Sequence, residues 1–347
     1  MKKNLPDKIY RKLHYLFWQK LHPGRWSLLL YLAYWKYLFA SKKNIERELG
    51  QEEYLYLTQE PNKGAGIGHQ MGNWNSGYWF SQRFGVKYAY SSFSNAKWDA
   101  FLGFGVDEVS AKELVKSGYK KRRLPYFDET SEKDMALMQG MIDAYRGQKV
   151  VFFLELDQFY EAQYGAMEFI KKKYHQSNMR QQEKLIYDKK CLNIAVHIRR
   201  GDIVVGQSNQ DPALTKRWVT TEYYAELIKK LVSIIPQGQE YKIYLFSQGN
   251  KEDFPELSDI KNLVYCLDMG AMDSFAHMVK ADMLLTSKSS FSYKPALLSE
   301  GIKICPMHFW HGYPKQQEWV LVDEEAGLTL EQMEQLKNVV GEQLCKK

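Results

Sequence analysis

The sequence predicts an α/β protein built on parallel, doubly wound sheets. Residues 192–305 alternate short apolar strand segments with amphipathic helical segments, which is the pattern of a parallel sheet covered by helices on both faces. In the first half, residues 54–58 and 150–154 are strand-type runs. A glycine-rich segment at residues 64–73 leads from the first of these runs toward a helical stretch, so the same alternation begins early in the chain.

The element boundaries follow from periodicity and from the glycine and proline stops. We expect strands at residues 54–58, 87–92, 150–154, 192–196, 241–246, 263–266, 283–286 and 302–305. We expect helices at residues 74–84, 111–118, 131–147, 221–235, 273–280 and 293–300, and a polar helical region at 161–184. The charge run at residues 120–123 is expected to be solvated, and a capping box of Thr329 and Gln332 opens a last helix.

The chain length predicts more than one domain. A chain of 347 residues is too long for one ordinary core and fits two domains of roughly 150 residues each. We expect a basic, aromatic helical extension at residues 1–50, an N-terminal α/β domain at 51–185, a C-terminal α/β domain at 186–325 and a C-terminal helix at 326–347.

The positive charge of the protein is concentrated at its N-terminus. The net charge is +7, and residues 1–50 hold 11 Lys or Arg against 3 acidic residues. Residues 8–20 predict a helix, and residues 27–40 form an apolar run shorter than the roughly 20 residues that span a bilayer. Aromatic side chains interleaved with Lys and Arg favour contact of residues 1–45 with the interface of an anionic membrane. A helical hairpin that packs on the body of the protein is the alternative.

Composition argues against several other classes of function. The four cysteines form no CxxC pair and the histidines are scattered, so neither a zinc site nor a disulfide framework is indicated. No basic stripe or recognition module follows residue 50, so nucleic-acid binding is not supported. Residues 64–73 lack the GxGxxG spacing of a dinucleotide site, although glycines there allow backbone amides to approach an anion.

The strongest candidate site is the stretch His197-Ile198-Arg199-Arg200-Gly201-Asp202, which follows an apolar strand run. A parallel strand that ends in this group brings cations to the carboxyl edge of a sheet, where open α/β folds bind ligands. Two adjacent guanidiniums are tolerable beside an anion, and the planar arginine fork matches phosphate oxygens. We therefore expect a site for a phosphorylated ligand. Salt bridges from the arginines to Asp202 or another carboxylate are the structural alternative.

The two arginines are expected to differ. The period of two along a strand places His197 and Arg199 on one face and Ile198 and Arg200 on the other. Arg199 then faces the ligand, whereas Arg200 holds the motif in place through a carboxylate. Glu155 and Asp157, which follow the strand at residues 150–154, are candidates for a general base or for structural bonds to loop amides.

These motifs, in this order, resemble the fucosyltransferase superfamily that includes the α1,2-, α1,6- and protein O-fucosyltransferases. Residues 197–202 match its HxRRxD signature, and Phe246-Ser247 lies where those enzymes have a strand ending in a serine turn. Residues 273–292 are similar to the third motif, and Gly66-Ile67-Gly68-His69-Gln70-Met71 looks like the GxGNQ(M/L) element of the bacterial α1,2 branch. The resemblance covers about residues 54–305.

The resemblance implies a GT-B architecture, with two Rossmann-like domains facing across a cleft. It also implies inverting, metal-independent transfer of fucose from GDP-fucose to a glycan acceptor, with no cofactor. In that family the first arginine of the signature binds the donor diphosphate, so Arg199 and Asp202 are the expected catalytic residues. The expected donor-binding residues are His197, Arg200, Gly66, Gly68, His69, Gln70, Ser247, Asp273, Ser289, Ser290 and Phe291.

The sequence departs from the family pattern at His69, Ile203, Lys288, Tyr293 and Lys294. Three functions therefore stay open: a fucosyltransferase in surface polysaccharide or lipopolysaccharide synthesis, a transferase for another nucleotide sugar, and a non-catalytic nucleotide- or glycan-binding relative. The compact chain favours a bacterial, cytoplasmic protein with peripheral contact at the inner face of the cell membrane. The acceptor and the linkage are not encoded in any motif that the sequence shows.

Overall fold

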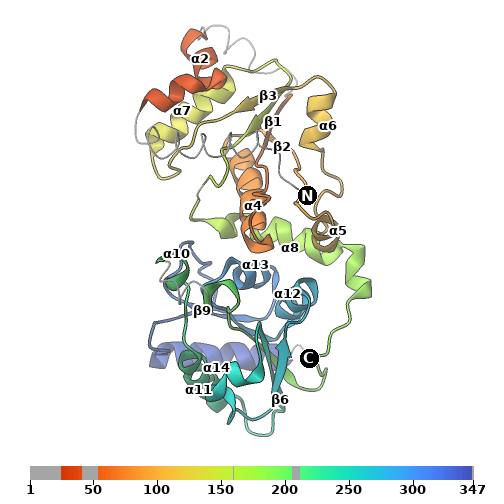
Figure 1. The fold of residues 1–347 in the computed structure, drawn as a ribbon, viewed down its shortest axis with the longest axis vertical. Helices are drawn as coiled ribbons and strands as arrows, with labels where there is room; N and C mark the ends of the chain where they lie inside the picture. Colours follow the sequence, from red (N-terminus) through yellow and green to blue (C-terminus); the bar gives the residue numbers. More distant parts are fainter. Residues whose placement is uncertain (1–24, 41–53, 159, 205–211, 346–347) are drawn as a thin grey trace. The chain divides into compact units, whose positions relative to one another are not determined.

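The structure is a computed structural model that describes residues 25–40, 54–158, 160–204 and 212–345. The helix predicted at residues 8–20 lies outside the described residues. Contacts between Cα atoms divide the chain into two compact units. Unit 1 comprises residues 1–60, 76–91 and 107–160, and unit 2 comprises residues 61–75, 92–106 and 161–347. Both units are α/β, and both sheets are entirely parallel (Figure 1).

The sheet of unit 1 has four strands in the order β2-β1-β4-β3. Its strands are β1 (Leu55–Thr58), β2 (Lys87–Tyr88), β3 (Lys120–Arg123) and β4 (Val150–Phe153). Helices α4 (Ile67–Arg83), α6 (Ala111–Lys116) and α7 (Glu132–Asp143) connect them. β4 is buried along its whole length, which agrees with its uninterrupted apolar sequence.

The charge run at residues 120–123 is exposed or half-buried, as predicted, but it also forms the edge strand β3, which the sequence did not predict. The ammonium group of Lys121 lies 3.8 Å from the Phe153 ring centre, and the guanidinium of Arg122 lies 5.6 Å from that of Tyr145. The long side chains therefore cover apolar surface while their charges stay near solvent. Charged residues also protect a sheet edge from pairing with another chain.

The sheet of unit 2 has six strands in the order β10-β9-β8-β5-β6-β7. These are β5 (Leu192–His197), β6 (Tyr241–Ser247), β7 (Leu263–Leu267), β8 (Met283–Leu285), β9 (Ile302–Pro306) and β10 (Trp319–Val322). Read from β7 to β10, this is the strand order 3-2-1-4-5-6 of Rossmann folds. The order reverses between β5 and β8, so these two neighbouring strands flank the topological switch point.

Helices cover both faces of this sheet (Figure 1). Alternate residues of β5, namely Leu192, Ile194 and Val196, join a core with α11 (Thr221–Ser233) and α14 (Leu330–Cys345). α12 (Ala271–Lys280) contacts β5, and its neighbour is α13 (Ser290–Leu298). The period of two in β5 therefore separates two environments, one of which leads to the α11 core.

Most element predictions for unit 2 are confirmed within a few residues. The capping box is also confirmed, because the Thr329 amide donates to Gln332 Oε1 at 2.9 Å and the Gln332 amide donates to Thr329 Oγ1 at 3.1 Å. The sequence did not predict β10 or α5 (Lys97–Leu102). The polar helical region consists of three short pieces: η2 (Gln163–Ala166), α8 (Met167–Gln176) and η3 (Asn178–Gln182).

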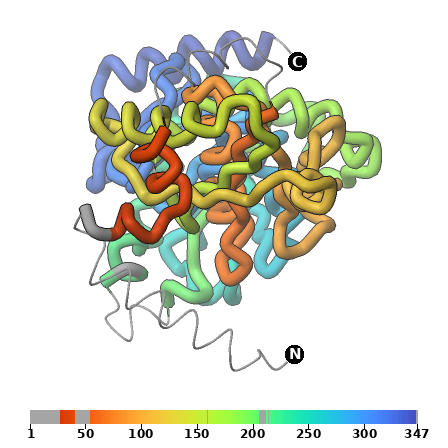
Figure 2. Tube along the Cα trace, turned by 90° about the horizontal axis from the view of Figure 1, so that it is seen from above, coloured from red at the N-terminus to blue at the C-terminus, as the bar shows by residue number. Residues whose placement is uncertain are grey.

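The apolar run at residues 27–40 forms η1 (Arg25–Leu30) and α2 (Leu32–Phe39). α2 lies against α7 in unit 1, as the red and yellow segments of Figure 2 show. Ala33 is fully buried in this contact, and the Tyr31 hydroxyl donates to Glu155 at 3.1 Å. In the part of the chain that the structure describes, no helix is long and apolar enough to span a membrane.

Candidate functional site

The predicted site lies at the switch point of unit 2. His197 is the last residue of β5, and the loop at residues 286–289 follows β8, its parallel neighbour. Ser287 Oγ lies 2.8 Å from His197 Nδ1, and the Phe291 ring centre lies 5.5 Å from that of His197. The first and third sequence motifs therefore meet, although about 90 residues separate them in the chain.

His197 is buried beside two cations. Burial lowers its pKa, and the charges of Arg199 and Arg200 lower it further, to about 3. The imidazole is therefore neutral at physiological pH, and it carries one N–H and one acceptor nitrogen. Because Ser287 engages Nδ1, Nε2 is the ring nitrogen left for a further hydrogen bond. A neutral ring suits a hydrogen bond to a sugar hydroxyl or a base.

Arg199 forms an ion pair with a carboxylate that is largely exposed to solvent. Its Nη2 lies 2.8 Å from the Asp202 carboxylate, and 60% of the Asp202 side chain is exposed. An exposed ion pair of this kind contributes only about 0–1 kcal/mol. A phosphate can therefore replace the carboxylate at little cost. The geometry fits both a ligand-binding role for Arg199 and the structural salt bridge considered from the sequence.

Arg200 is held by the protein itself. Its guanidinium donates to the carbonyl oxygens of Arg199 and Val219 and to Thr221 Oγ1, and it stacks 4.2 Å from the Trp218 ring centre. The expected carboxylate partner is replaced by these neutral groups among the described residues. Arg200 therefore fixes the end of β5 against α11, and its surroundings differ from those of His197 as the strand period predicts.

Two further residues shape this strand end. Gly201 has φ of 71°, a backbone conformation that favours glycine, and a Cβ there would meet only the movable end of the Gln248 side chain. The Ser247 hydroxyl donates to the Ile198 carbonyl at 2.7 Å. Ser247 thus ties the end of β6 to the motif on β5, which is a positioning role rather than a ligand contact.

The glycine-rich segment is the first turn of α4, which begins at Ile67 and not at residue 74 as predicted. A Cβ on Gly68 would lie 2.5 Å from the carbonyl carbon and oxygen of Ser290. The N-terminus of α4 therefore packs directly on the N-terminus of α13. Residues 61–75 belong to unit 2 by their contacts, although the sequence assigned them to the N-terminal domain.

The remaining glycine-segment residues have different surroundings. Gln70 is buried, and its amide group bonds Ala65 O at 2.7 Å and both the amide and the hydroxyl of Ser94. This makes Gln70 a structural brace. Gly66 and His69 are exposed at the start of the helix, on the side that a ligand can approach. A Cβ on Gly66 would meet no atom within 4 Å.

The loop at residues 286–289, called the serine loop below, caps helix α13 and lies at its N-terminus. Ser289 is buried, and its Oγ accepts from the Phe291 amide at 3.2 Å as the N-cap of α13. Ser290 is half-buried and contacts Gly68 through its backbone. Two helix N-termini therefore converge beside Arg199's strand, and each adds partial positive charge. Asp273 lies exposed in the first turn of α12, after the carboxyl end of β7.

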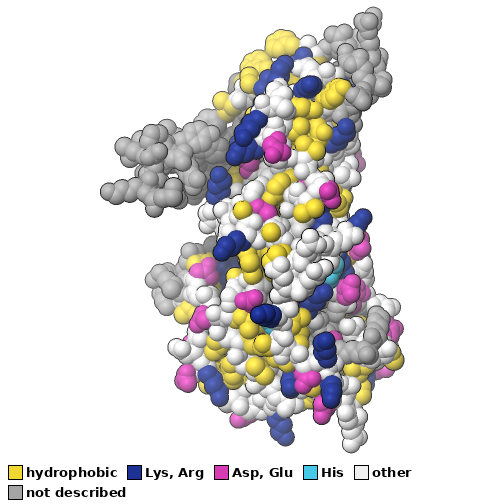
Figure 3. Space-filling view, turned by 90° about the vertical axis from the view of Figure 1, so that its right-hand side faces the viewer, with side chains coloured by type: hydrophobic (Ala, Val, Ile, Leu, Met, Phe, Trp, Pro, Cys, Tyr) yellow, Lys and Arg dark blue, Asp and Glu magenta, His cyan; other side chains and the backbone are white. Residues whose placement is uncertain are grey.

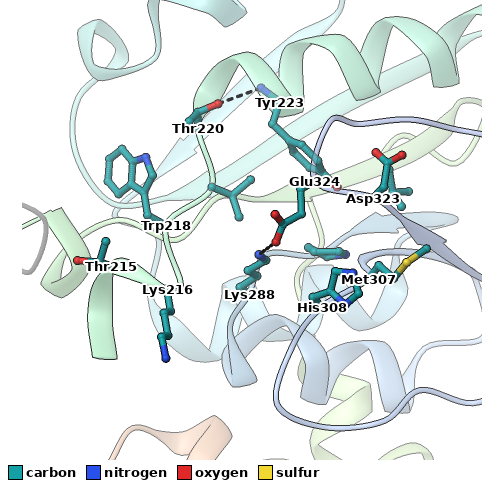
Figure 4. A pocket seen from close by; sticks show the side chains of 13 residues that line it. Thr215, Lys216, Trp218, Thr220, Tyr223, Lys288, Met307, His308, Asp323 and Glu324 are labelled. Carbon is teal, nitrogen blue, oxygen red and sulfur yellow. Dashed lines mark hydrogen bonds and ion pairs between the residues drawn. The ribbon is translucent and has the colours of Figure 1, made fainter. Parts of the chain in front are cut away.

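A cavity of about 530 Å³ opens at the carboxyl ends of β9 and β10 in the same unit (Figure 4). Its lining combines cations, aromatic rings and carboxylates, which include Lys216, Trp218, Tyr223, Lys288, His308 and Glu324. Trp218 packs on Arg200, so the cavity adjoins the motif. The sequence did not predict these residues as a site. Of these residues, only Lys288, which lies in the serine loop, is among the departures from the family pattern.

Lys294 is a second feature that the sequence did not assign to the site. It is fully buried on α13, and its ammonium group contacts the Gln163 side chain and lies 3.9 Å from the position of a Cβ on Gly72. Burial lowers its pKa to about 7. Two glycines of α4 therefore allow α13 to approach closely: Gly68 lies against Ser290, and Gly72 lies against Lys294.

Within the described ranges, no three His, Cys, Asp or Glu side chains come together in a group that could hold a metal ion. Comparisons with protein-family models, with curated proteins and with solved structures found no match. The site must therefore be interpreted from its own geometry: a partly exposed arginine, a neutral histidine and two helix N-termini at a Rossmann switch point.

Proposed function

We propose that this protein is a glycosyltransferase that uses a nucleoside diphosphate sugar, and that the donor is GDP-fucose. The observation that carries the proposal is the position of Arg199, two residues after the central strand β5 and paired, among the described residues, with the exposed Asp202. The donor diphosphate takes the place of that carboxylate. The amides at the N-termini of α4 and α13 supply further donors to its oxygens.

The reaction follows from this placement. An acceptor hydroxyl oxygen attacks the anomeric carbon of the sugar while the bond from that carbon to the β-phosphate oxygen breaks. Negative charge grows on the departing GDP, so a fixed guanidinium stabilises the transition state more than the ground state. Asp202, released from Arg199, accepts the hydroxyl proton. Attack from the face opposite the leaving group inverts the anomeric centre, and no step requires a metal.

The choice of Asp202 as base rests on access. Glu155, the other candidate from the sequence, is only 2% exposed and is paired with Arg123 at 3.4 Å and with Tyr31. Asp202 is the more exposed carboxylate and lies three residues from the phosphate-binding arginine. A carboxylate in solvent contact, rather than one buried in an ion pair, suits proton transfer from an entering acceptor.

The proposal extends to the sugar and to the architecture through the resemblance of the sequence motifs. His197 and Asp273 contact the nucleoside, Ser290 binds phosphate, and the two units form a GT-B enzyme. The acceptor is a glycan of a surface polysaccharide or lipopolysaccharide, and the reaction takes place at the cytoplasmic side of the membrane. The cavity beside Trp218 has the volume of a small-molecule site and can take part of either substrate.

A nucleotide panel and a donor panel test the proposal together. We expect GDP, but not UDP or CMP, to raise the melting temperature, because only ligands that bind the folded state stabilise it. GDP release from GDP-fucose should exceed release from GDP-mannose. Stabilisation by UDP alone would indicate another donor, nucleotide binding without turnover would indicate a non-catalytic relative, and no response to any nucleotide would contradict the proposal.

A further inference from the structure

The segment η1–α2 carries a concentration of exposed apolar side chains. Seven large hydrophobic residues in 29–39 are at least 36% exposed: Leu29, Leu30, Leu32, Trp35, Tyr37, Leu38 and Phe39. No other stretch of eleven described residues holds more than three such side chains. Figure 3 draws one face of the molecule, on which hydrophobic side chains lie interspersed with charged ones. A concentration like that in η1–α2 marks an interaction surface rather than ordinary surface variation.

The same segment is anchored to unit 1 by its opposite side. Ala33 is fully buried, and Tyr37 packs so closely on α7 that a Cβ at Gly140 would lie 2.6 Å from its ring. The Tyr145 hydroxyl donates to the Leu32 carbonyl at 3.4 Å. The exposed face is therefore held in a fixed orientation. Trp35 and Phe39 also stack on each other, with ring centres 6.1 Å apart, and form one continuous apolar surface.

Positive charge surrounds this surface. Lys36 lies within α2, and α2 contacts β3, whose four residues are all basic. Glu60 offsets part of that charge, since it lies 3.5 Å from Lys121 and 3.9 Å from Arg123. Among the described residues, Lys120 and Arg122 bond neutral partners. The sequence of residues 1–50 adds 11 basic residues against 3 acidic ones.

We propose that the exposed face of η1–α2 docks unit 1 on the surface of an anionic lipid bilayer. Leu, Trp and Phe side chains enter the boundary between headgroups and acyl chains, and the flanking Lys and Arg contact anionic headgroups. The short helix lies in the plane of the interface. Charge favours this occupant over a second copy of the chain, because two copies of a basic surface repel each other. This inference is independent of the catalytic proposal.

Vesicle cosedimentation of the full chain tests the inference. The double variant Leu32→Ser/Phe39→Ser removes two side chains that are 65% and 80% exposed, so folding is little affected. The control Val109→Ser/Leu330→Ser removes two that are 45% and 91% exposed elsewhere. We expect the parent and the control to bind vesicles with 30% phosphatidylglycerol in phosphatidylcholine, and the first variant to bind roughly tenfold or more weakly.

Lys36→Glu keeps the apolar face and reverses one charge, so it should weaken binding to anionic vesicles, as should raising the salt concentration. Binding of the Leu32→Ser/Phe39→Ser variant equal to that of the parent would overturn the inference, and so would the absence of parent binding. A lipid-free dimer of the parent that this variant abolishes would also overturn it, because the face would then be a self-association surface. None of these readouts depends on nucleotide binding or turnover.

Discussion

The carboxyl edges of the two parallel sheets differ in how their charges are satisfied. In unit 1 Glu155 follows the carboxyl end of the central strand β4, and it is buried and paired with Arg123 and Tyr31. In unit 2 the equivalent point carries Arg199, paired with a carboxylate that is 60% exposed. At the first edge the buried partner is the carboxylate and Arg123 is 38% exposed, whereas at the second edge the more buried partner is Arg199, at 19%, and its carboxylate is the exposed one.

The difference indicates where an anion can bind without a large rearrangement. Breaking a buried pair leaves an uncompensated charge and costs several kcal/mol, while exchanging an exposed partner costs little. Two helix N-termini also converge at the edge of unit 2, where Gly68 packs on Ser290. Under the proposed function, phosphate binds at the edge of unit 2, and perturbing each edge separately tests this expectation.

The largest effect is expected from Gly68→Ala. A Cβ there would lie 2.5 Å from backbone atoms of Ser290, which cannot rotate away as a side chain can. We expect a loss of about 3 kcal/mol of unfolding free energy, at the upper end for overpacking, and a loss of the melting-temperature rise caused by GDP. Gly66→Ala is the matched control, because its Cβ would meet nothing within 4 Å. Equal behaviour of the two variants would show that the close approach of α4 and α13 is unimportant.

A second, smaller effect concerns pH. The pKa of His197 is about 3 in the folded protein, against 6.5 for a free side chain. Below pH 6.5 the imidazole of His197 becomes protonated in the unfolded chain but stays neutral in the folded chain. The free energy of unfolding therefore decreases as the pH falls. Each pH unit costs about 1.4 kcal/mol, which gives about 2 kcal/mol at pH 5.

Denaturant titrations at pH 7 and pH 5 measure this effect. The His197→Asn variant should lose less stability between the two values than the parent, by about 2 kcal/mol. His69→Asn, at an exposed position of α4, is the control and should follow the parent. If the His197 variant also followed the parent, the buried neutral imidazole would be refuted.

The smallest effect is expected from Ser289→Ala. Removing this N-cap should cost about 1 kcal/mol of stability, as should Ser131→Ala, which removes the corresponding cap of α7 in unit 1. Only the Ser289 variant should also bind GDP more weakly, because its helix N-terminus faces the ligand. Calorimetric titration of both variants decides this, and equal GDP affinities would remove the serine loop from the site.

The parallel α/β fold could be predicted because unit 2 alternates apolar strands with helices, and the capping box at Thr329 marked the start of the last helix correctly. β3 was missed because all four of its residues are basic; the contacts of Lys121 and Arg122 with aromatic rings are not evident from local polarity. The start of α4 was missed because four glycines from 64 to 72 resemble a loop.

The site was predictable in its central element and less so around it. The pairing of His197 with Ser287 follows from two strands that end at one switch point. The partners of Arg200 could not be predicted, because two of them are backbone carbonyl oxygens, which every residue has and which no residue type identifies. The cavity residues Lys216 and Trp218 come from a connection whose path only the folded chain defines.

Isothermal titration of GDP into three proteins in metal-free buffer tests the central claim most directly. The parent should bind GDP, Arg199→Ala in unit 2 should bind at least about 100-fold more weakly, since charge-assisted bonds are the strong ones, and Arg123→Ala in unit 1 should bind like the parent. This pattern would assign the nucleotide site to the edge that carries Arg199. Undiminished GDP binding by Arg199→Ala, or loss of binding in Arg123→Ala alone, would contradict the account.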